Sequence, residues 1–227
     1  MFRILRVGVA LLLAAWMIRQ VRKPSGWLGR QVLRGMNQRH AAVTDWGLQQ
    51  VRVARKASVL DVGCGGGRTV GRLASLAFEG NAVGLDYSAT STAVARSTNA
   101  PEIDAGRIGI VRGTVARLPF PDCTFDIVTA VETHYYWPDL PANMREILRV
   151  LKPGGTFALI AETYRGGPFR LLYGVVMWVI SAAFLSEAEH RDLLEQAGFA
   201  EVATKHQPGT TWICATGRRP PNSVRPE

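Results

Sequence analysis

The chain has 227 residues, 47% of them hydrophobic, which is enough to bury the core of one α/β-sized domain with an appendage. Its cysteines (Cys64, Cys123 and Cys214) are odd in number and widely spaced, and no His/Cys cluster has metal spacing, which excludes a disulfide scaffold and a zinc-type site. The formal charge of +9 is concentrated, because residues 1–56 carry eleven of the 27 Lys and Arg and one of the 18 acidic residues. The remaining chain is nearly neutral, so only the N-terminal arm favours an anionic partner.

The first 23 residues predict a basic and apolar helix. Residues 7–18 contain no charge and are flanked by Arg6 and Arg19. As a helix this run is about 18 Å long against a hydrocarbon core of about 30 Å, which is short for a membrane span. Arginines at both ends, with Trp16 near one of them, favour a helix anchored at the membrane interface. A soluble helix packed on the domain or on a partner, and a cleaved leader, remain open alternatives.

Residues 24–56 predict a helical cap in front of the main domain. Leu28, Val32 and Met36 recur at helical spacing, and Ser25 is a suitable N-cap. Asp45 is the first acidic residue of the chain, so residues 24–44 of the cap carry only basic charges and continue the basic arm.

Residues 57–70 read ASVLDVGCGGGRTV and form the segment around which the rest is arranged. They begin as an apolar run with β-branched Val59 and Val62, which is typical of a strand buried on both faces. The run then breaks into glycines and continues at helical spacing. This order predicts a strand, a turn and a helix N-terminus whose bare backbone approaches a ligand closely.

Asp61, two residues before the first glycine, indicates which ligand this turn suits. The dinucleotide pattern G-x-G-x-x-G fails, because counting from Gly63 places Arg68 where the last glycine belongs. A carboxylate beside the turn repels a pyrophosphate and pairs with an ammonium group, which favours a ligand with an amino-acid end. Asp86, nineteen residues beyond Gly67 and at the end of the next predicted strand, is placed to accept hydrogen bonds from ribose hydroxyls. A helix cap is the alternative role for Asp86.

Two further segments follow in order along the chain. Residues 113–128 read GTVARLPFPDCTFDIV, and residues 151–155 read LKPGG before an apolar strand. With the glycine turn and the acid after the second strand, they resemble the class I S-adenosylmethionine-dependent methyltransferases of the methyltransferase-11-like type. The resemblance covers roughly residues 51–218. It implies a Rossmann-like, seven-stranded, mostly parallel α/β sheet with helices on both faces and an antiparallel final strand, preceded here by the N-terminal helical arm.

The resemblance also implies S-adenosylmethionine as the cofactor, and the spacing of the Cys and His residues gives no reason to expect a metal. Thr114 stands where relatives often have aspartate near the adenine, and its hydroxyl makes that contact without a charge. N-terminal helices often cover the pocket in this family, so His40, Thr44 and Trp46 are further pocket candidates, with ordinary helix packing as the alternative. The cofactor-binding residues that the resemblance implies are Asp61, Gly63, Cys64, Gly65, Gly67, Asp86, Tyr87, Thr114, Val115 and Glu132.

The loop after the predicted strand 125–131 is where an acceptor meets the cofactor, because ligands gather at the carboxyl ends of strands in open α/β sheets. Residues 132–139 read ETHYYWPD and lack the [DN]-P-P-[YF] pattern of enzymes that methylate amino groups of DNA bases or glutamine. His134 is the candidate general base, because a histidine has an ordinary pKa of about 6.5. Tyr135 and Tyr136 are candidates for positioning the acceptor. A structural His134 is the alternative.

Residues 163–185 interrupt the strand–helix alternation and predict a cap over the acceptor, with core packing as the alternative. Ser186 then caps a helix over residues 187–196, with Glu189 in the capping-box position. Residues 202–206 and 211–216 predict two closing strands, and residues 219–227 a flexible tail. The cap residues that favour an apolar acceptor are Leu172, Val176, Met177, Trp178 and Ile180.

These features predict a methyltransferase that moves a methyl group from S-adenosylmethionine to a small, apolar or lipid-like acceptor by in-line displacement. A catalytically silent binding or scaffold protein and an NAD(P)-dependent oxidoreductase are the alternatives. The expected partners are the acceptor and, through residues 1–23, a membrane surface, whereas nucleic acid is not expected. Because the cofactor is made in the cytoplasm, we expect a cytoplasmic protein anchored to the inner face of the membrane.

Overall fold

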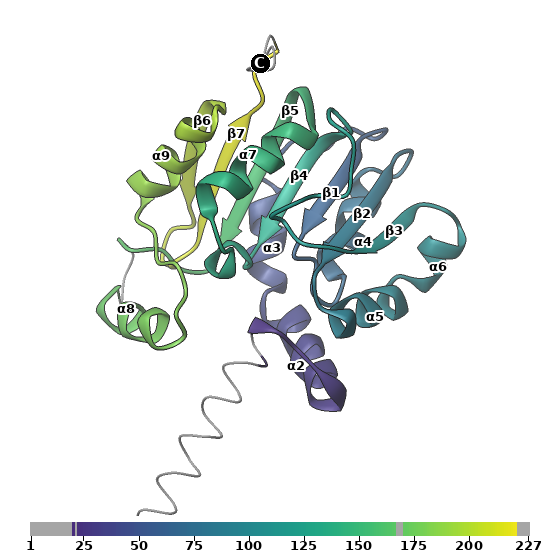
Figure 1. Cartoon of the computed structure of the whole chain (residues 1–227), viewed down its shortest axis with the longest axis horizontal. Helices are drawn as coiled ribbons and strands as arrows, with labels where there is room; N and C mark the ends of the chain where they lie inside the picture. Colours follow the sequence, from purple (N-terminus) through teal and green to yellow (C-terminus); the bar gives the residue numbers. More distant parts are fainter. Residues whose placement is uncertain (1–19, 21, 167–169, 222–227) are drawn as a thin grey trace, which may run out of the picture.

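The computed structural model describes residue 20, residues 22–166 and residues 170–221 (Figure 1). The predicted N-terminal helix falls almost entirely outside these described residues, as do residues 222–227 of the predicted tail. In the described part of the chain, none of the helices combines the length and the apolar character needed to cross a bilayer.

A seven-stranded sheet forms the centre of the molecule, in the order β3-β2-β1-β4-β5-β7-β6. Neighbouring strands from β3 to β5 pair in parallel, whereas β7 runs antiparallel to both β5 and β6. The predicted fold class, with its antiparallel final strand, is therefore confirmed. The strands are β1 (Ser58–Val62), β2 (Asn81–Asp86), β3 (Ile108–Arg112), β4 (Phe125–Val131), β5 (Leu151–Ala161), β6 (Ala200–His206) and β7 (Ile213–Arg218).

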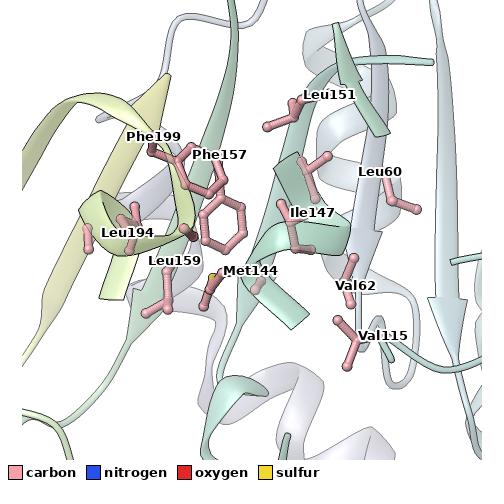
Figure 2. Close-up of a cluster of buried hydrophobic side chains, with 14 of the residues drawn as sticks. Leu60, Val62, Val115, Met144, Ile147, Leu151, Phe157, Leu159, Leu194 and Phe199 are labelled. Atoms are coloured by element: carbon pink, nitrogen blue, oxygen red, sulfur yellow. The ribbon is translucent and has the colours of Figure 1, made fainter. Parts of the chain in front are cut away.

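Helices cover both faces of the sheet, because the central strands are apolar on both sides. Along β5, Phe157 and Leu159 point into one hydrophobic cluster, and the intervening Ala158 and Ile160 point into the other. Helices α7 (Leu140–Val150) and α9 (Glu187–Ala197) pack over the first cluster (Figure 2). Helices α3 (Ala41–Leu48), α4 (Arg68–Leu76) and α5 (Ala89–Thr98) pack over the second. The short helix α6 (Ala100–Asp104) precedes β3.

The helix limits follow local signals, and several strand limits do not. Ser186 and Glu189 form the predicted capping box of α9, and Gly198 ends that helix at a φ of 100°. Strand β5 begins at Leu151, immediately after α7, although the sequence predicts a turn through residue 155. The reason is pairing: Leu151 lies opposite Phe125 of β4 with a register shift beside it, and such long-range pairing is absent from local sequence.

Two helices lie near the edge where the parallel strands end. Helix α2 (Gly26–Arg39) precedes α3, and α8 (Arg170–Val179) belongs to the segment inserted after β5. Both lie beneath the lower edge of the sheet in Figure 1. Among the predicted cap residues, Met177 is buried and Ile180 is partly buried, whereas Leu172, Val176 and Trp178 are exposed.

Candidate functional site

A cavity of about 370 Å³ lies at the carboxyl ends of β1, β2 and β4. Small-molecule sites in proteins occupy about 300–1,000 Å³, and in open α/β sheets they lie at this edge. Five parts of the chain form its wall: the glycine turn after β1, the end of β2, the segment after β3, the segment after β4, and the inner face of α2 with the start of α3. The position agrees with the predicted ligand site.

The glycine turn adopts a conformation that other residues disfavour. Gly63, Gly65 and Gly67 have φ values of 78°, 51° and 83°. A Cβ atom on Gly63 would lie 2.1 Å from the hydroxyl oxygen of Thr133, and a Cβ atom on Gly67 would lie 2.8 Å from the Cα atom of Ala95. Any side chain at these positions would force the turn away from its neighbours. Gly63 therefore keeps a bare backbone against the cavity, and Gly67 lets the N-terminus of α4 pack closely against α5.

Asp86 holds this turn in place. Its carboxylate accepts hydrogen bonds from the backbone amides of Gly65 at 3.0 Å and Ser88 at 2.8 Å. Burial raises the pKa of Asp86 above its ordinary value, although these two hydrogen bonds oppose the shift. The N-cap of α5 is Ser88, whose hydroxyl accepts a hydrogen bond from Ser91 at 3.3 Å. Asp86 is therefore not the helix cap and remains on the cavity wall.

Asp61 lies at the end of β1 and is almost completely buried, with 2% of its surface exposed. The hydroxyl of Thr129 on β4 donates a hydrogen bond to its carboxylate at 2.7 Å. Burial raises the pKa of Asp61 to about 7, and the nearby charge of Asp86 adds to the shift. The cavity wall thus contains a buried carboxyl group with no positively charged partner among the described residues to favour its ionisation. A cationic ligand would lower the free-energy cost of ionising it.

Glu132 belongs to a second group of acidic and basic side chains at the same cavity. It follows β4 with a φ of 56°, and burial raises its pKa to about 8. Three side chains meet here: one carboxylate oxygen of Glu132, one carboxylate oxygen of Glu162 and one ring nitrogen of His40 all lie within 4.8 Å of one another. The Nε2 atom of His40 lies 3.7 Å from Glu162, and burial lowers the pKa of His40 despite that neighbour. His40 is therefore neutral at neutral pH and can accept a proton.

The structure contradicts the prediction that His134 is the general base. Its side chain is completely buried, does not line the cavity, and has no hydrogen-bond partner on either ring nitrogen in the described part of the chain. The centroid of its ring lies 4.2 Å from that of Tyr135 and 5.4 Å from that of His190. Burial holds the pKa of His134 well below the ordinary value. The physical reason is the 3₁₀ turn η1 (His134–Tyr136), which directs its first two side chains into the core.

The two tyrosines of this turn have different positions. Tyr135 is buried outside the cavity wall, and its hydroxyl donates to Glu132 at 3.3 Å, so its predicted contact with the acceptor is also wrong. Tyr136 does line the cavity, together with Trp137. Of these two adjacent tyrosines, Tyr135 lies in the core and Tyr136 lies at the site, and their identical residue type does not predict this difference.

Most of the other candidates reach the cavity wall. Trp46 does not, because the centroid of its ring lies 6.0 Å from that of Trp212 on the far side of α3. Gly67 does not either, because it is the N-cap of α4 and faces Ala95 of α5. The expected helical cover over the pocket did not include Asn37 of α2 among its candidates, and this side chain donates a hydrogen bond to the carbonyl of Gly66 at 3.2 Å, which ties the helix to the glycine turn. The helical spacing from Leu33 to His40 is the signal that could have revealed this face. The predicted residues on the wall are Asp61, Gly63, Cys64, Gly65, Asp86, Tyr87, Thr114, Val115, Glu132, Tyr136, His40 and Thr44.

The described cavity residues lie largely within a segment with known relatives. Residues 60–159 match the model of a family described as a methyltransferase domain. A demethylmenaquinone methyltransferase of Lactiplantibacillus plantarum is 34% identical over 132 residues, which cover 58% of this chain and 55% of that protein. A demethylmenaquinone methyltransferase of Listeria monocytogenes is 30% identical over 171 residues, covering 70% of this chain and 72% of the relative. A sterol 24-C-methyltransferase of Aspergillus fumigatus is 32% identical over 148 residues, covering 63% of this chain and 33% of the relative.

Solved structures share the fold. A putative methyltransferase of Haloferax volcanii, in complex with the Trm112 activator, superposes with a TM-score of 0.75 at 24% identity, covering 86% of this chain and 96% of that one. Human N-acetylserotonin methyltransferase in complex with S-adenosylmethionine gives a TM-score of 0.72 at 20% identity, covering 84% of this chain and 55% of the human chain. At these identities the comparison establishes the arrangement of strands and helices.

Proposed function

The chain belongs to the class I S-adenosylmethionine-dependent methyltransferases, with S-adenosylmethionine as its methyl donor, and we propose that it methylates a small, apolar or lipid-like acceptor by in-line displacement. The observation that carries the proposal is the shared cavity. Its glycine turn and Asp61 suit the amino-acid end of the cofactor, and its wall continues into the aromatic and apolar side chains of α2 and of the segment after β4. One chamber therefore offers both a cofactor surface and an acceptor surface.

The residues on the cavity wall fit the cofactor in charge and in shape. Asp61 and Glu132 have pKa values raised to about 7 and about 8, so their ionisation is favoured by a cation brought into the cavity. Asp86 keeps acceptor capacity for ribose hydroxyls at the end of β2, and Thr114 and Val115 offer a hydroxyl and backbone groups to the adenine edge. When bound, S-adenosylmethionine supplies a methyl group on a sulfonium and leaves as a neutral thioether. The chain itself then needs to align the acceptor and exclude water.

His40 replaces His134 as the candidate base. It lines the cavity, it is neutral at neutral pH, and the carboxylate of Glu162 at 3.7 Å stabilises the imidazolium that forms when it takes a proton. Glu132, with a pKa of about 8, is mostly protonated at neutral pH and is the weaker acceptor there. An acceptor that has already lost its proton needs neither residue.

The acceptor is proposed from the chemistry of the wall. Leu33 and Met36 of α2 and Tyr136 and Trp137 after η1 line the cavity, which gives it apolar and aromatic surfaces away from Asp61. The relatives are named for demethylmenaquinone and for a sterol, both of which are lipids. These names support an apolar acceptor for this chain without identifying it.

Labelled methyl transfer tests this proposal. Purified protein is incubated with S-adenosylmethionine carrying a labelled methyl group and with a lipid extract or an aqueous extract from a strain that lacks the gene. We expect label in a lipid-soluble product that wild-type cells contain and the deletion strain lacks. Label in aqueous products alone would reject the lipid-like acceptor. Tight cofactor binding without any labelled product would indicate a catalytically silent binding protein.

A further inference from the structure

Helix α8 exposes an apolar surface that no other described part of the chain covers. Leu171 is 81% exposed and Trp178 is 78% exposed, and Met177 is the residue of this helix that is buried. Burial of apolar surface is the main favourable term in folding, so a helix that buries so little of its apolar surface needs another contact. The exposed apolar residues of α8 are Leu171, Leu172, Val175, Val176, Trp178 and Val179.

The outer face of α2 has a complementary composition. Trp27, Arg30 and Arg34 follow helical spacing on one face and are all exposed, with Trp27 at 65%. Leu33, Met36 and Asn37, on another face of the same helix, line the cavity. Tryptophan and arginine together are typical of a helix at a membrane interface, where the ring lies at the headgroup level and the guanidinium meets phosphates.

Charge adds an independent argument. Residues 20–44 carry Arg22, Lys23, Arg30, Arg34 and Arg39 and no acidic residue, and of these Arg39 lies 3.8 Å from Glu162. Residues 163–186 carry Arg170 and Arg165 and no acidic residue, and Arg165 pairs with Glu189 of α9. Arg30 and Arg34 form no ion pair with an acidic side chain within the described ranges. A second copy of this chain would bring the same positive charge to the contact and repel it, whereas an anionic bilayer is attracted.

Both helices lie at the edge of the sheet that contains the cavity. Helix α8 follows the carboxyl end of β5, and the amide of Ala183 after it donates a hydrogen bond to the carbonyl of Tyr135 at 2.8 Å. On the other side, the guanidinium of Arg22 lies 5.9 Å from the ring centroid of Tyr136 on the cavity wall. Figure 1 shows α2 and α8 on the same side of the sheet.

We propose that the α8–α2 surface docks on an anionic lipid bilayer. This surface consists of the exposed apolar residues of α8 with Trp27, Arg30 and Arg34 of α2. The apolar side chains enter the boundary between headgroups and acyl chains, and the arginines bind lipid phosphates. The inference rests on the surface and not on the identity of the acceptor, and it places the cavity edge next to the bilayer.

Vesicle flotation tests the proposal with the full chain. The probes are vesicles of phosphatidylcholine alone and vesicles of phosphatidylcholine and phosphatidylglycerol in equal parts. One variant combines Leu172→Glu and Trp178→Glu on α8, and a second combines Arg30→Glu and Arg34→Glu on α2. The matched controls are Phe78→Glu, which changes an aromatic residue that is 50% exposed at the opposite edge of the sheet, and Arg52→Glu, which changes an exposed arginine before β1.

We expect wild type and both controls to float with the anionic vesicles, and each double variant to lose about tenfold or more in vesicle affinity. Binding of S-adenosylhomocysteine at wild-type affinity shows that each variant is folded. Equal flotation of wild type and both double variants would overturn the proposal, because the binding would then come from another part of the chain. So would a wild-type protein that ignores vesicles and instead dissociates from dimer to monomer on the α8 substitutions. None of these assays contains a methyl acceptor, so their failure would leave the proposed reaction untouched.

Discussion

Replacing Asp61 with asparagine should make the cofactor-free protein more stable at alkaline pH while weakening its affinity for S-adenosylmethionine. Burial raises the pKa of this carboxyl from 3.8 to about 7 in the folded chain. Because the folded pKa exceeds the unfolded one, the folded state holds the proton more tightly. The resulting stabilisation is complete below about pH 4 and is lost as the pH rises through about 7.

The size of the effect follows from the two pKa values. A shift of about three units corresponds to about 4 kcal/mol in total, of which about 2.5 kcal/mol is lost between about pH 5 and about pH 8. In Asp61→Asn the amide oxygen can still accept the hydrogen bond from Thr129, and no proton titrates. The amide nitrogen needs a new partner, which costs about 1–2 kcal/mol at every pH. The free energy of unfolding of the variant, minus that of wild type, should therefore rise by about 2.5 kcal/mol from about pH 5 to about pH 8.

Urea unfolding followed by tryptophan fluorescence, in the absence of cofactor, measures both free energies at each pH. Asp104→Asn is the control, because it removes the same charge from an exposed position on α6. Calorimetry at about pH 8 should show S-adenosylmethionine bound about 10–100-fold more weakly by Asp61→Asn, since a charge-assisted hydrogen bond contributes about 1.5–3 kcal/mol. Parallel stability curves for wild type and Asp61→Asn would refute the electrostatic reasoning, and so would unchanged cofactor affinity.

Three further predictions concern the same cavity. Thr129→Val removes the hydroxyl that lowers the pKa of Asp61, so the midpoint of the pH dependence of cofactor affinity should move to higher pH. Calorimetric titrations at several pH values on both sides of about pH 7 measure this midpoint, and an unchanged midpoint would show that the hydrogen bond has no effect on the pKa of Asp61. Gly63→Ala should abolish cofactor binding and lower the free energy of unfolding by about 2 kcal/mol or more, because the added methyl group would meet Thr133. The control is Gly106→Ala, at a similar φ of 73° but with open space around it, which should leave cofactor binding intact. Equal cofactor affinities of the two variants in a titration would contradict this prediction. His40→Gln should lower kcat on the identified acceptor by about 10²–10⁴-fold with cofactor affinity unchanged, and a pH–rate profile identical to that of wild type would exclude His40 as the base.

Local patterns were sufficient where the physical cause is local. The glycine turn needs positive φ at Gly63, Gly65 and Gly67, and only glycine adopts these values freely, so its place in the sequence marks its place in the fold. The capping box of α9 is equally local, because Ser186 and Glu189 satisfy backbone groups within one turn of helix. Such features were correctly predicted from residue types and their spacing.

The acid–base group of the site depended on contacts that no local pattern contains. His134 has the right residue type in the right loop, and a single 3₁₀ turn buries it in the core. His40, Glu132 and Glu162 come from a helix before the sheet and from the ends of two paired strands, and they meet only because α2 packs across the edge of the sheet.

The sequence by itself determined the fold family, the glycine turn and the acids that end β1 and β2, because backbone sterics and strand-end positions act over a few residues. Only the tertiary structure decided which side chains reach the cavity, which carboxyl groups are buried enough for their pKa values to rise, and which apolar helix face is left uncovered. Burial and desolvation depend on what packs against a residue, and that is set by parts of the chain far away in sequence.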